Sequence, residues 1–262
     1  MITTVLKGGL GNQMFQYAIG RSIAKLSNTT LCLDTSCYRR SRRYPFPFHL
    51  NKFLIAANAT SNTIGHLIAE PNLQYNPSVV KEYTENITLN GYWQDERYFD
   101  KIAPLLLLDL RLKPEYMSEE YLDAVDFLES LEEPVFVHIR RGERVDDKTA
   151  RSVHGLIGKA YYREAIDYVK HEKPGSTMIF FSDDPKYADD IFGPMNDYEH
   201  FSLMTLCKHA IIANSSFSWW AAWLIRNTEK IVVAPRRWNA NENSSNKEIV
   251  PRGWKKLDTQ YE

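Results

Sequence analysis

Short apolar runs alternate with longer amphipathic stretches along the whole chain. Residues 2–7 and 30–34 predict two strands, and residues 8–13 form a glycine-rich turn after the first of them. Residues 14–26 predict a helix between the strands, because its apolar positions recur at helical spacing on one face: Phe15, Ala18, Ile19, Ile23 and Leu26. This strand–helix–strand order is typical of a parallel sheet.

The second half repeats the alternation, with strands predicted at 135–139, 177–181, 210–213 and 231–234 and helices at 161–171, 185–191, 203–209 and 219–226. Between the halves we expect a strand at 86–93, a short helix at 94–102 and a helix at 118–130 that Ser118 caps. The sequence Glu132-Glu133-Pro134 then breaks the pattern. We therefore predict an α/β protein with two Rossmann-like domains, 1–131 and 132–262, and leave open that the C-terminal tail packs back on the first domain.

Composition narrows the functional classes. The 262 residues carry a net charge of −1, which argues against a general nucleic-acid binder. The three cysteines are too few for a disulfide framework, and no Cys/His cluster has metal-binding spacing. The start lacks the features of a signal peptide, and the apolar runs are too short to span a membrane. These features favour a reduced, cytosolic setting.

The glycine-rich turn at 8–13, with Asp34 ending the next strand, partly matches a dinucleotide-binding fingerprint. Met14 occupies the position of the third glycine, and no Gly-Lys-Ser/Thr follows as in a phosphate-binding loop. A nicotinamide-dependent dehydrogenase is therefore a weak alternative. The same turn can bring backbone N–H groups and the Asn12 amide close to a sugar or a phosphate.

Polar side chains follow the strands of the second half. Arg140 and Arg141 end the run 135–139, where paired guanidinium groups suit a diphosphate, although a surface network with Glu143 is an alternative. Asp183 and Asp184 follow the next strand and could bind a base or a ribose, or cap a helix. The serines Ser215, Ser216 and Ser218 open a helix whose N-terminus can bind phosphate, and one of them would serve as its cap.

Together these groups predict a nucleotide-diphosphate site. The chain contains no Asp-x-Asp, the arrangement that usually holds a divalent ion on such a diphosphate, so arginine must neutralise the leaving group. A dense basic patch, Arg39, Arg40, Arg42 and Arg43, is either a solvated loop or a contact for an anionic acceptor or membrane headgroups.

Several segments resemble the α-1,2-fucosyltransferases of glycosyltransferase family 11, in their bacterial form. His138-Ile139-Arg140-Arg141-Gly142-Glu143 is similar to the family's His-x-Arg-Arg-x-Asp motif, and the segment from Gly8 to Ala18 is similar to its amino-terminal motif. Phe181-Ser182-Asp183-Asp184 and the segment from Ile211 to Trp223 are similar to its later motifs. The resemblance runs in the family's order from the first strand to Trp238.

The resemblance implies a GT-B fold, with two Rossmann-like domains that face a cleft and the acceptor on the side of the first. It implies an inverting transfer of L-fucose from GDP-fucose to the 2-hydroxyl of a galactose-type acceptor, with no cofactor and no metal. That acceptor is a glycan, free or lipid-linked, as in O-antigen or capsule synthesis, and an enzyme of this kind could sit peripherally on the cytoplasmic face of the membrane.

The resemblance also implies residue roles. Arg140 would hold the β-phosphate, Arg141 would support its loop or pair with Glu143, and His138 would lie along the donor. Asp183 or Asp184 would contact guanine or ribose, and Asn12 would face the transferred sugar from the other domain. The diphosphate would be lined from the segment Asn214, Ser215, Ser216, Phe217 and Ser218.

The base that deprotonates the acceptor is left open. Glu143 stands where the family has aspartate and is one methylene longer, which favours a brace for the arginines over a base. His154 is a second candidate, and the leaving phosphate could take the proton itself. A transferase for another GDP-sugar or another linkage, and a non-catalytic nucleotide- or carbohydrate-binding module, remain alternatives.

Overall fold

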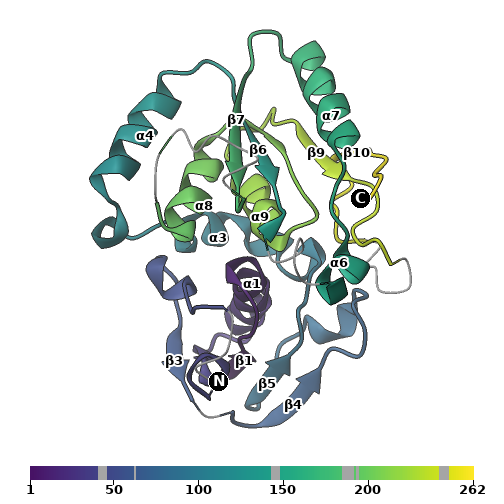
Figure 1. Ribbon diagram of the computed structural model, residues 1–262. Helices are drawn as coiled ribbons and strands as arrows, with labels where there is room; N and C mark the ends of the chain where they lie inside the picture. Colours follow the sequence, from purple (N-terminus) through teal and green to yellow (C-terminus); the bar gives the residue numbers. More distant parts are fainter. Residues whose placement is uncertain (41–45, 62, 143–147, 185–191, 193–194, 242–247) are drawn as a thin grey trace. The chain divides into compact units, whose positions relative to one another are not determined.

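The computed structural model describes residues 1–40, 46–61, 63–142, 148–184, 192, 195–241 and 248–262. The chain divides into two compact units, Met1–Lys113 and Pro114–Glu262. Each unit contains a five-stranded sheet whose strand pairs are all parallel (Figure 1). This confirms the predicted α/β class with two Rossmann-like halves.

The first sheet has the order β3-β2-β1-β5-β4. Its strands are β1 Ile2–Val5, β2 Leu31–Asp34, β3 Asn58–Thr60, β4 His66–Ala69 and β5 Ile87–Asn90. β1 lies between β2 and β5, so the segments that follow β1 and β5 leave the sheet at the same edge. The short elements of this unit are α2 Ser36–Arg40, η1 Leu50–Lys52, η2 Pro77–Val79, η3 Glu96–Tyr98, η4 Asp100–Ile102 and α3 Ala103–Asp109.

Helix α1, Leu10–Leu26, packs on β1 and buries most of its length. It begins at Leu10, four residues before the predicted start, because Gly9 acts as the N-cap and its carbonyl accepts the Asn12 and Gln13 N–H groups. Asn12 therefore lies in the first helical turn rather than in a loop. Leu26 was expected on the apolar face but is 47% exposed, since it lies in the last turn.

The second sheet has the order β10-β9-β8-β6-β7, with β6 Pro134–Ile139, β7 Thr177–Ser182, β8 His209–Ile211, β9 Val232–Pro235 and β10 Lys255–Leu257. Its helices are α4 Glu119–Glu129, α6 Lys148–His154, α7 Lys159–Glu172, α8 Asp197–Leu206 and α9 Ser216–Leu224, after the 3-10 turn η5 Pro114–Tyr116. Helices α4 and α7 lie on opposite sides of β6 and β7 (Figure 1). The chain leaves β6 toward β7 and leaves β8 toward β9, so the strand order reverses between β6 and β8. Ligand crevices of open parallel sheets form at such points.

The first unit ends at Lys113, whereas the break at Glu132-Glu133-Pro134 predicted a boundary after residue 131. Helix α4 accounts for the difference, because it packs on α8 of the second sheet. Its N-cap Ser118 donates its backbone N–H to Glu199 at 2.9 Å, and Tyr121 and Ser202 share a hydrogen bond between their hydroxyls. The C-terminal tail pairs within the second unit, where β10 joins β9 and the Glu262 N–H donates to the Leu156 carbonyl.

Other elements also differ from the sequence-based expectation. β5 ends at Asn90 instead of residue 93, and the predicted helix 94–102 consists of the two 3-10 turns η3 and η4. α6 forms in a stretch expected to be a loop, and the short strands β3, β4 and β10 were not predicted. The predicted helix 185–191 lies outside the described residues.

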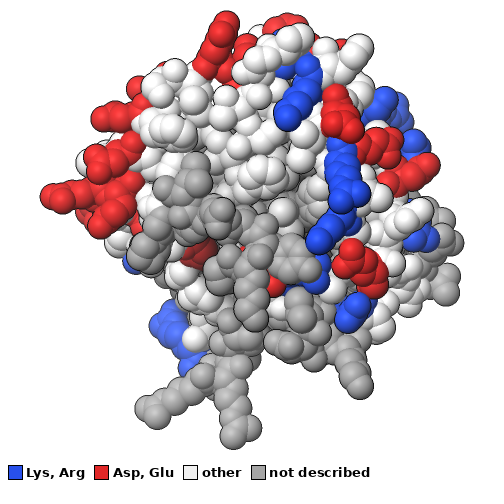
Figure 2. All heavy atoms as spheres, turned by 45° about the horizontal axis from the view of Figure 1, so that its top comes forward, with Lys and Arg blue, Asp and Glu red and all other residues white. Residues whose placement is uncertain are grey.

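Acidic and basic side chains are mixed on the face that Figure 2 shows. Asp and Glu gather toward one edge, and Lys and Arg alternate with Asp and Glu toward the other. This agrees with the net charge of −1, and the residues that are coloured on this face form no continuous basic surface of the kind that binds nucleic acid.

A buried histidine joins β8 to the residue that precedes β6. His209 is fully buried, its Nε2 lies 2.6 Å from a Glu133 carboxylate oxygen, and its Nδ1 accepts the Ile231 N–H. Because Nδ1 accepts, the ring is the neutral Nε2–H form. Burial lowers the pKa of His209, while hydrogen bonding to His209 lowers the pKa of Glu133 against the opposing effect of its own desolvation. Both shifts have the same consequence for stability, because the unfolded chain binds more protons than the folded one in acid.

We therefore expect stability to fall as the pH drops below about 6.5, the ordinary pKa of histidine, and to fall further as the pH drops below about 4.5, the ordinary pKa of glutamate, toward the lowered pKa of Glu133. Urea midpoints at pH 7.5 and 5.5 measure the first loss. His209→Gln should shrink the difference between the two midpoints, whereas the exposed control His171→Gln should leave it unchanged. An equal difference in all three proteins would refute this origin.

Candidate active site

The two arginines of the second unit follow β6, beside the end of β7. The strand register places Ile139 opposite Ser182, and the Ser182 hydroxyl donates to the Ile139 carbonyl at 2.9 Å. β7 and β8 pair with the two edges of β6, whose residues Pro134–His138 are buried, and only Ile139 at its carboxyl end is half-buried. The fold thus delivers Arg140 and Arg141 to the point where the strand order reverses.

Asp183 is bound to both arginines. One of its carboxylate oxygens accepts the Arg141 backbone N–H at 2.7 Å, and the other lies 2.5 Å from Nη1 of Arg140. Gly142 follows with φ +26°, and a side chain at that position would collide with the Asp183 carboxylate. The Arg140 side chain is 26% exposed, so part of it faces solvent although its Nη1 is bound to Asp183.

Asp184 and Arg141 lie beside this pair. Nε of Arg141 is 3.9 Å from Asp184, and its Nη1 is 3.5 Å from Glu262 at the C-terminus. The structure therefore brings together four predicted site residues, Arg140, Arg141, Asp183 and Asp184. Glu143, the suggested brace, lies outside the described residues. The carboxylate that the structure places on Arg140 belongs to Asp183, one of the two aspartates that the resemblance placed at guanine or ribose.

His138 connects the arginines to the start of α9. Its buried ring lies 5.7 Å from the Phe217 ring, and Phe217 in turn contacts Phe201 of α8. Tyr162 of α7 donates its hydroxyl to the His138 carbonyl. The end of β6 is therefore fixed from both sides of the sheet.

The predicted diphosphate segment divides into an accessible part and a buried part. Ser215, Ser216 and Phe217 are half-buried at the N-terminus of α9. Ser218 is fully buried, and its hydroxyl donates to the Ser215 carbonyl at 3.3 Å. The buried Asn214 amide donates to the carbonyls of His154 and Trp238 at 2.8 and 2.9 Å. Ser218 and Asn214 thus stabilise the turn, and only Ser215, Ser216 and Phe217 are accessible to a ligand.

His154, the other candidate base, ends α6 and is exposed. Its Nδ1 lies 3.1 Å from Oδ1 of Asn239, and its carbonyl accepts from Asn214. His154 therefore lies beside Asn214 and the segment after β9 that contains Trp238 and Asn239.

The first unit holds its own polar cluster where β1 ends. Gly8 has φ +82°, and a Cβ built there would lie 2.6 Å from Nδ2 of Asn12. The buried Gln13 amide donates to the Gly8 and Pro47 carbonyls and accepts from the N–H groups of His49 and Leu50. The Asn12 amide oxygen accepts from Nε2 of Gln94 at 2.9 Å.

Sequence reasoning missed Gln13 and Gln94. The available signal for Gln94 was its place directly after the predicted strand 86–93, at the sheet edge where Asn12 follows the first strand. The sequence assigned Gln94 to the start of a helix instead, whereas in the structure it lies in the segment after β5, which ends at Asn90.

Among the described residues, no group of three or more His, Cys, Asp or Glu side chains is arranged to hold a metal ion. Within the same ranges, no helix has the length and apolar composition needed to cross a membrane.

The comparisons with known proteins now settle the family, because the model of glycosyl transferase family 11 matches residues 1–258. The chain belongs to glycosyltransferase family 11. It is 30% identical to an alpha-1,2-colitosyltransferase of Escherichia coli, over 98% of this chain and 99% of that protein. It is also 30% identical to the Escherichia coli O-antigen biosynthesis glycosyltransferase WbnK, over 92% and 95% of the two chains.

More distant members of the family include a Bos taurus galactoside 2-alpha-L-fucosyltransferase, SEC1, with 24% identity over 86% of this chain and 64% of that one. Among solved structures, the fucosyltransferase NodZ from Bradyrhizobium is similar, with a TM-score of 0.53 at 14% identity. The match covers 84% of this chain and 92% of NodZ. This similarity confirms the GT-B-like fold class, and the family membership makes the protein a glycosyltransferase.

Proposed function

We propose that this family 11 enzyme transfers L-fucose from GDP-fucose to the 2-hydroxyl of a galactose-type acceptor, with inversion and without a metal ion. The single observation that carries the proposal is the partly exposed Arg140, which Asp183 holds at the carboxyl end of β6. A fixed guanidinium at the reversal point of a parallel sheet suits a diphosphate. The names of the family's distant members, which include galactoside 2-alpha-L-fucosyltransferases, support the donor and the linkage.

The reaction develops negative charge on the departing GDP while the fucose C1 becomes oxocarbenium-like. Arg140 supplies a preorganised positive group for that charge, and the backbone N–H groups at the start of α9, near Ser215 and Ser216, add donors. Asp183 acts on Arg140 in this scheme, because its carboxylate fixes the guanidinium before the donor binds. Asn12 would contact the transferred sugar. Arg140 then takes the charge-neutralising role that a divalent ion has in many transferases that use nucleotide sugars.

The base is proposed to be either Glu143 or His154, with direct proton transfer to the leaving phosphate as the third route. Nδ1 of His154 lies 3.1 Å from Oδ1 of Asn239, and the ring could accept a substrate proton at Nε2 if Nδ1 carries the hydrogen of that contact. The pH profile of turnover distinguishes a base near pH 6–7 from a carboxylate.

A second donor deserves equal testing because a relative at 30% identity is named a colitosyltransferase. Colitose is the 3-deoxy form of L-fucose. A site that binds the 3-hydroxyl of fucose would reject colitose by up to roughly 10⁴-fold, because its polar groups would stay unpaired. A site that leaves the 3-hydroxyl in an apolar pocket would accept both sugars.

The deciding experiment measures GDP release from GDP-fucose, GDP-colitose and GDP-mannose, with and without lactose, in excess EDTA and in Mg²⁺. We expect acceptor-dependent release from GDP-fucose that EDTA does not reduce. Loss of release in EDTA that Mg²⁺ restores would overturn the metal-free mechanism. A preference for GDP-colitose would reassign the donor. If no GDP-sugar reacts and GDP at saturating concentration also fails to raise the melting temperature, the nucleotide site itself is refuted.

Attachment to the membrane surface through the basic patch is also proposed, for an acceptor that is lipid-linked. Arg42 and Arg43 lie outside the described residues, and Arg39 donates to the Thr35 hydroxyl at 2.9 Å. Binding to anionic vesicles that weakens with salt would support it.

A further inference from the structure

The segment that follows β5 in the first unit has an unusual conformation. Trp93 is buried, at 1% exposure, yet has φ +55°, a left-handed conformation that a bulky residue adopts only under constraint. Its indole Nε1 is buried and has no hydrogen-bond partner among the described residues. Strained backbone and orphaned polar atoms cost folding free energy, and they persist mainly where function selects them.

Neighbouring side chains enforce this conformation. The carboxylate of Glu70 accepts the Tyr92 N–H at 2.6 Å and the Trp93 N–H at 3.1 Å. Gln16 of α1 donates to the Gly91 carbonyl and accepts the Lys7 N–H, which ties the segment to the end of β1. The strain at Trp93 is therefore stabilised from β4 and from α1, the helix that also carries Asn12.

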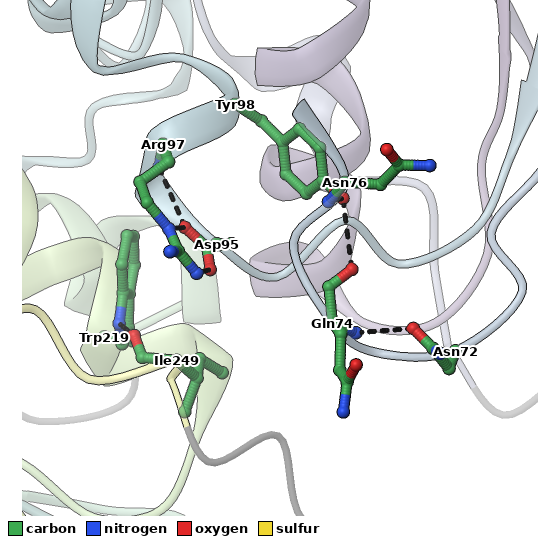
Figure 3. A network of polar contacts seen from close by, with 8 residues as sticks. All are labelled: Asn72, Gln74, Asn76, Asp95, Arg97, Tyr98, Trp219 and Ile249. Atoms are coloured by element: carbon green, nitrogen blue, oxygen red, sulfur yellow. Dashed lines mark hydrogen bonds and ion pairs between the residues drawn. The ribbon is translucent and has the colours of Figure 1, made fainter. Parts of the chain in front are cut away.

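The chain beyond the turn is equally fixed. Asp95 accepts the Arg97 backbone N–H and binds its guanidinium through both carboxylate oxygens, at 2.9 and 2.6 Å (Figure 3). The Tyr98 hydroxyl accepts the Asn76 N–H and donates to the Gln74 carbonyl (Figure 3). Gln94 thus stands between two constrained residues, Trp93 and Asp95.

The side chain so placed binds the Asn12 amide. Nε2 of Gln94 donates to Oδ1 of Asn12 at 2.9 Å, across 82 positions of sequence. This contact turns the Asn12 oxygen toward Gln94, so the N–H₂ is the end of the carboxamide that is directed away from Gln94. Gly8 leaves room for that group, because its missing Cβ would lie 2.6 Å from Nδ2.

We propose that Gln94 is a positioning residue that sets the orientation of the Asn12 amide, so that Asn12 presents its N–H₂ as a hydrogen-bond donor to a hydroxyl or ring oxygen of the sugar. The inference rests on the proposed function, in which Asn12 contacts the transferred sugar. It adds that Gln94 decides whether Asn12 donates or accepts the hydrogen bond to the sugar. It also explains why a strained turn is kept at the edge of the first sheet.

The test is a double-mutant cycle in the full-length enzyme, with kcat and KM measured for donor and acceptor. Gln94→Ala should lower kcat about tenfold, the effect of one misdirected hydrogen bond. Gln94→Glu should lower it further at pH 8, because a carboxylate accepts from Nδ2 and reverses the Asn12 amide. In the Asn12→Ala background both Gln94 changes should have little additional effect, since Gln94 acts through Asn12.

Two controls separate positioning from general damage. Gln74→Ala removes an exposed glutamine side chain of the same unit and should leave kcat and KM unchanged. The rise in melting temperature with GDP, which the second unit is proposed to bind, should be the same in all variants. Multiplicative losses in the cycle, or equal kcat for Gln94→Glu and wild type, would overturn the inference while an active wild type keeps the proposed function. An inactive wild type with every GDP-sugar would overturn the proposed function, and this inference with it.

Discussion

Replacing Arg140 by alanine is expected to lower turnover on GDP-fucose on the order of 10²-fold or more, as loss of one donor in a preorganised anion site does. The physical reason is the position of the guanidinium, which is held by the Asp183 carboxylate at 2.5 Å and remains 26% exposed. Without it, the negative charge that grows on GDP in the transition state has no fixed counter-charge at the end of β6. Initial rates of GDP release with saturating acceptor measure the effect.

Two further variants make this expectation specific. Arg140→Lys keeps the charge but loses the forked donor geometry, so it should recover only part of the turnover. Arg163→Ala removes an exposed arginine from α7 and serves as the matched control, with an expected change of less than twofold. Near-normal turnover of the Arg140→Ala enzyme would refute the assigned role of this residue.

The largest expected effect on stability comes from Trp219→Ala in α9. The Trp219 ring is fully buried, packs against Trp220 and Trp254 with ring centroids 5.2 and 5.5 Å away, and donates its Nε1–H to the Ile249 carbonyl at 2.7 Å (Figure 3). Truncation leaves a large cavity and an unpaired buried carbonyl, and should cost about 3–5 kcal/mol of unfolding free energy. Urea unfolding followed by far-UV circular dichroism measures it.

Trp219→Phe keeps an aromatic ring and loses the hydrogen bond, so it should cost about 1–3 kcal/mol and remain measurable if the alanine variant does not fold. Leu206→Ala changes a residue that is 43% exposed and should shift stability by no more than about 0.5 kcal/mol. A Trp219→Ala protein as stable as Leu206→Ala would show that the tryptophan cluster does not support α9.

The glycine-rich turn at 8–13 shows which features local sequence predicts and which it does not. The apolar spacing in 14–26 correctly predicts the helix, but its start depends on the backbone of Gly9, which accepts the first helical N–H groups. The unusual φ of Gly8 and its close approach to Asn12 depend on atoms that are near only in the folded chain. The sequence therefore identified Asn12 as a candidate without revealing its partner.

The sequence by itself determined the class of the fold and the two arginines of the candidate site. Short apolar runs such as 135–139 that alternate with amphipathic stretches are typical of buried parallel strands, so they predict α/β structure, and Arg140 and Arg141 directly follow that run. The tertiary structure decided the pairings. Asp183 lies 42 residues from Arg141 and Gln94 lies 82 from Asn12, and only the parallel strand register brings such residues to one sheet edge. Local patterns report burial and periodicity, whereas these contacts arise from strand order, which no short segment encodes.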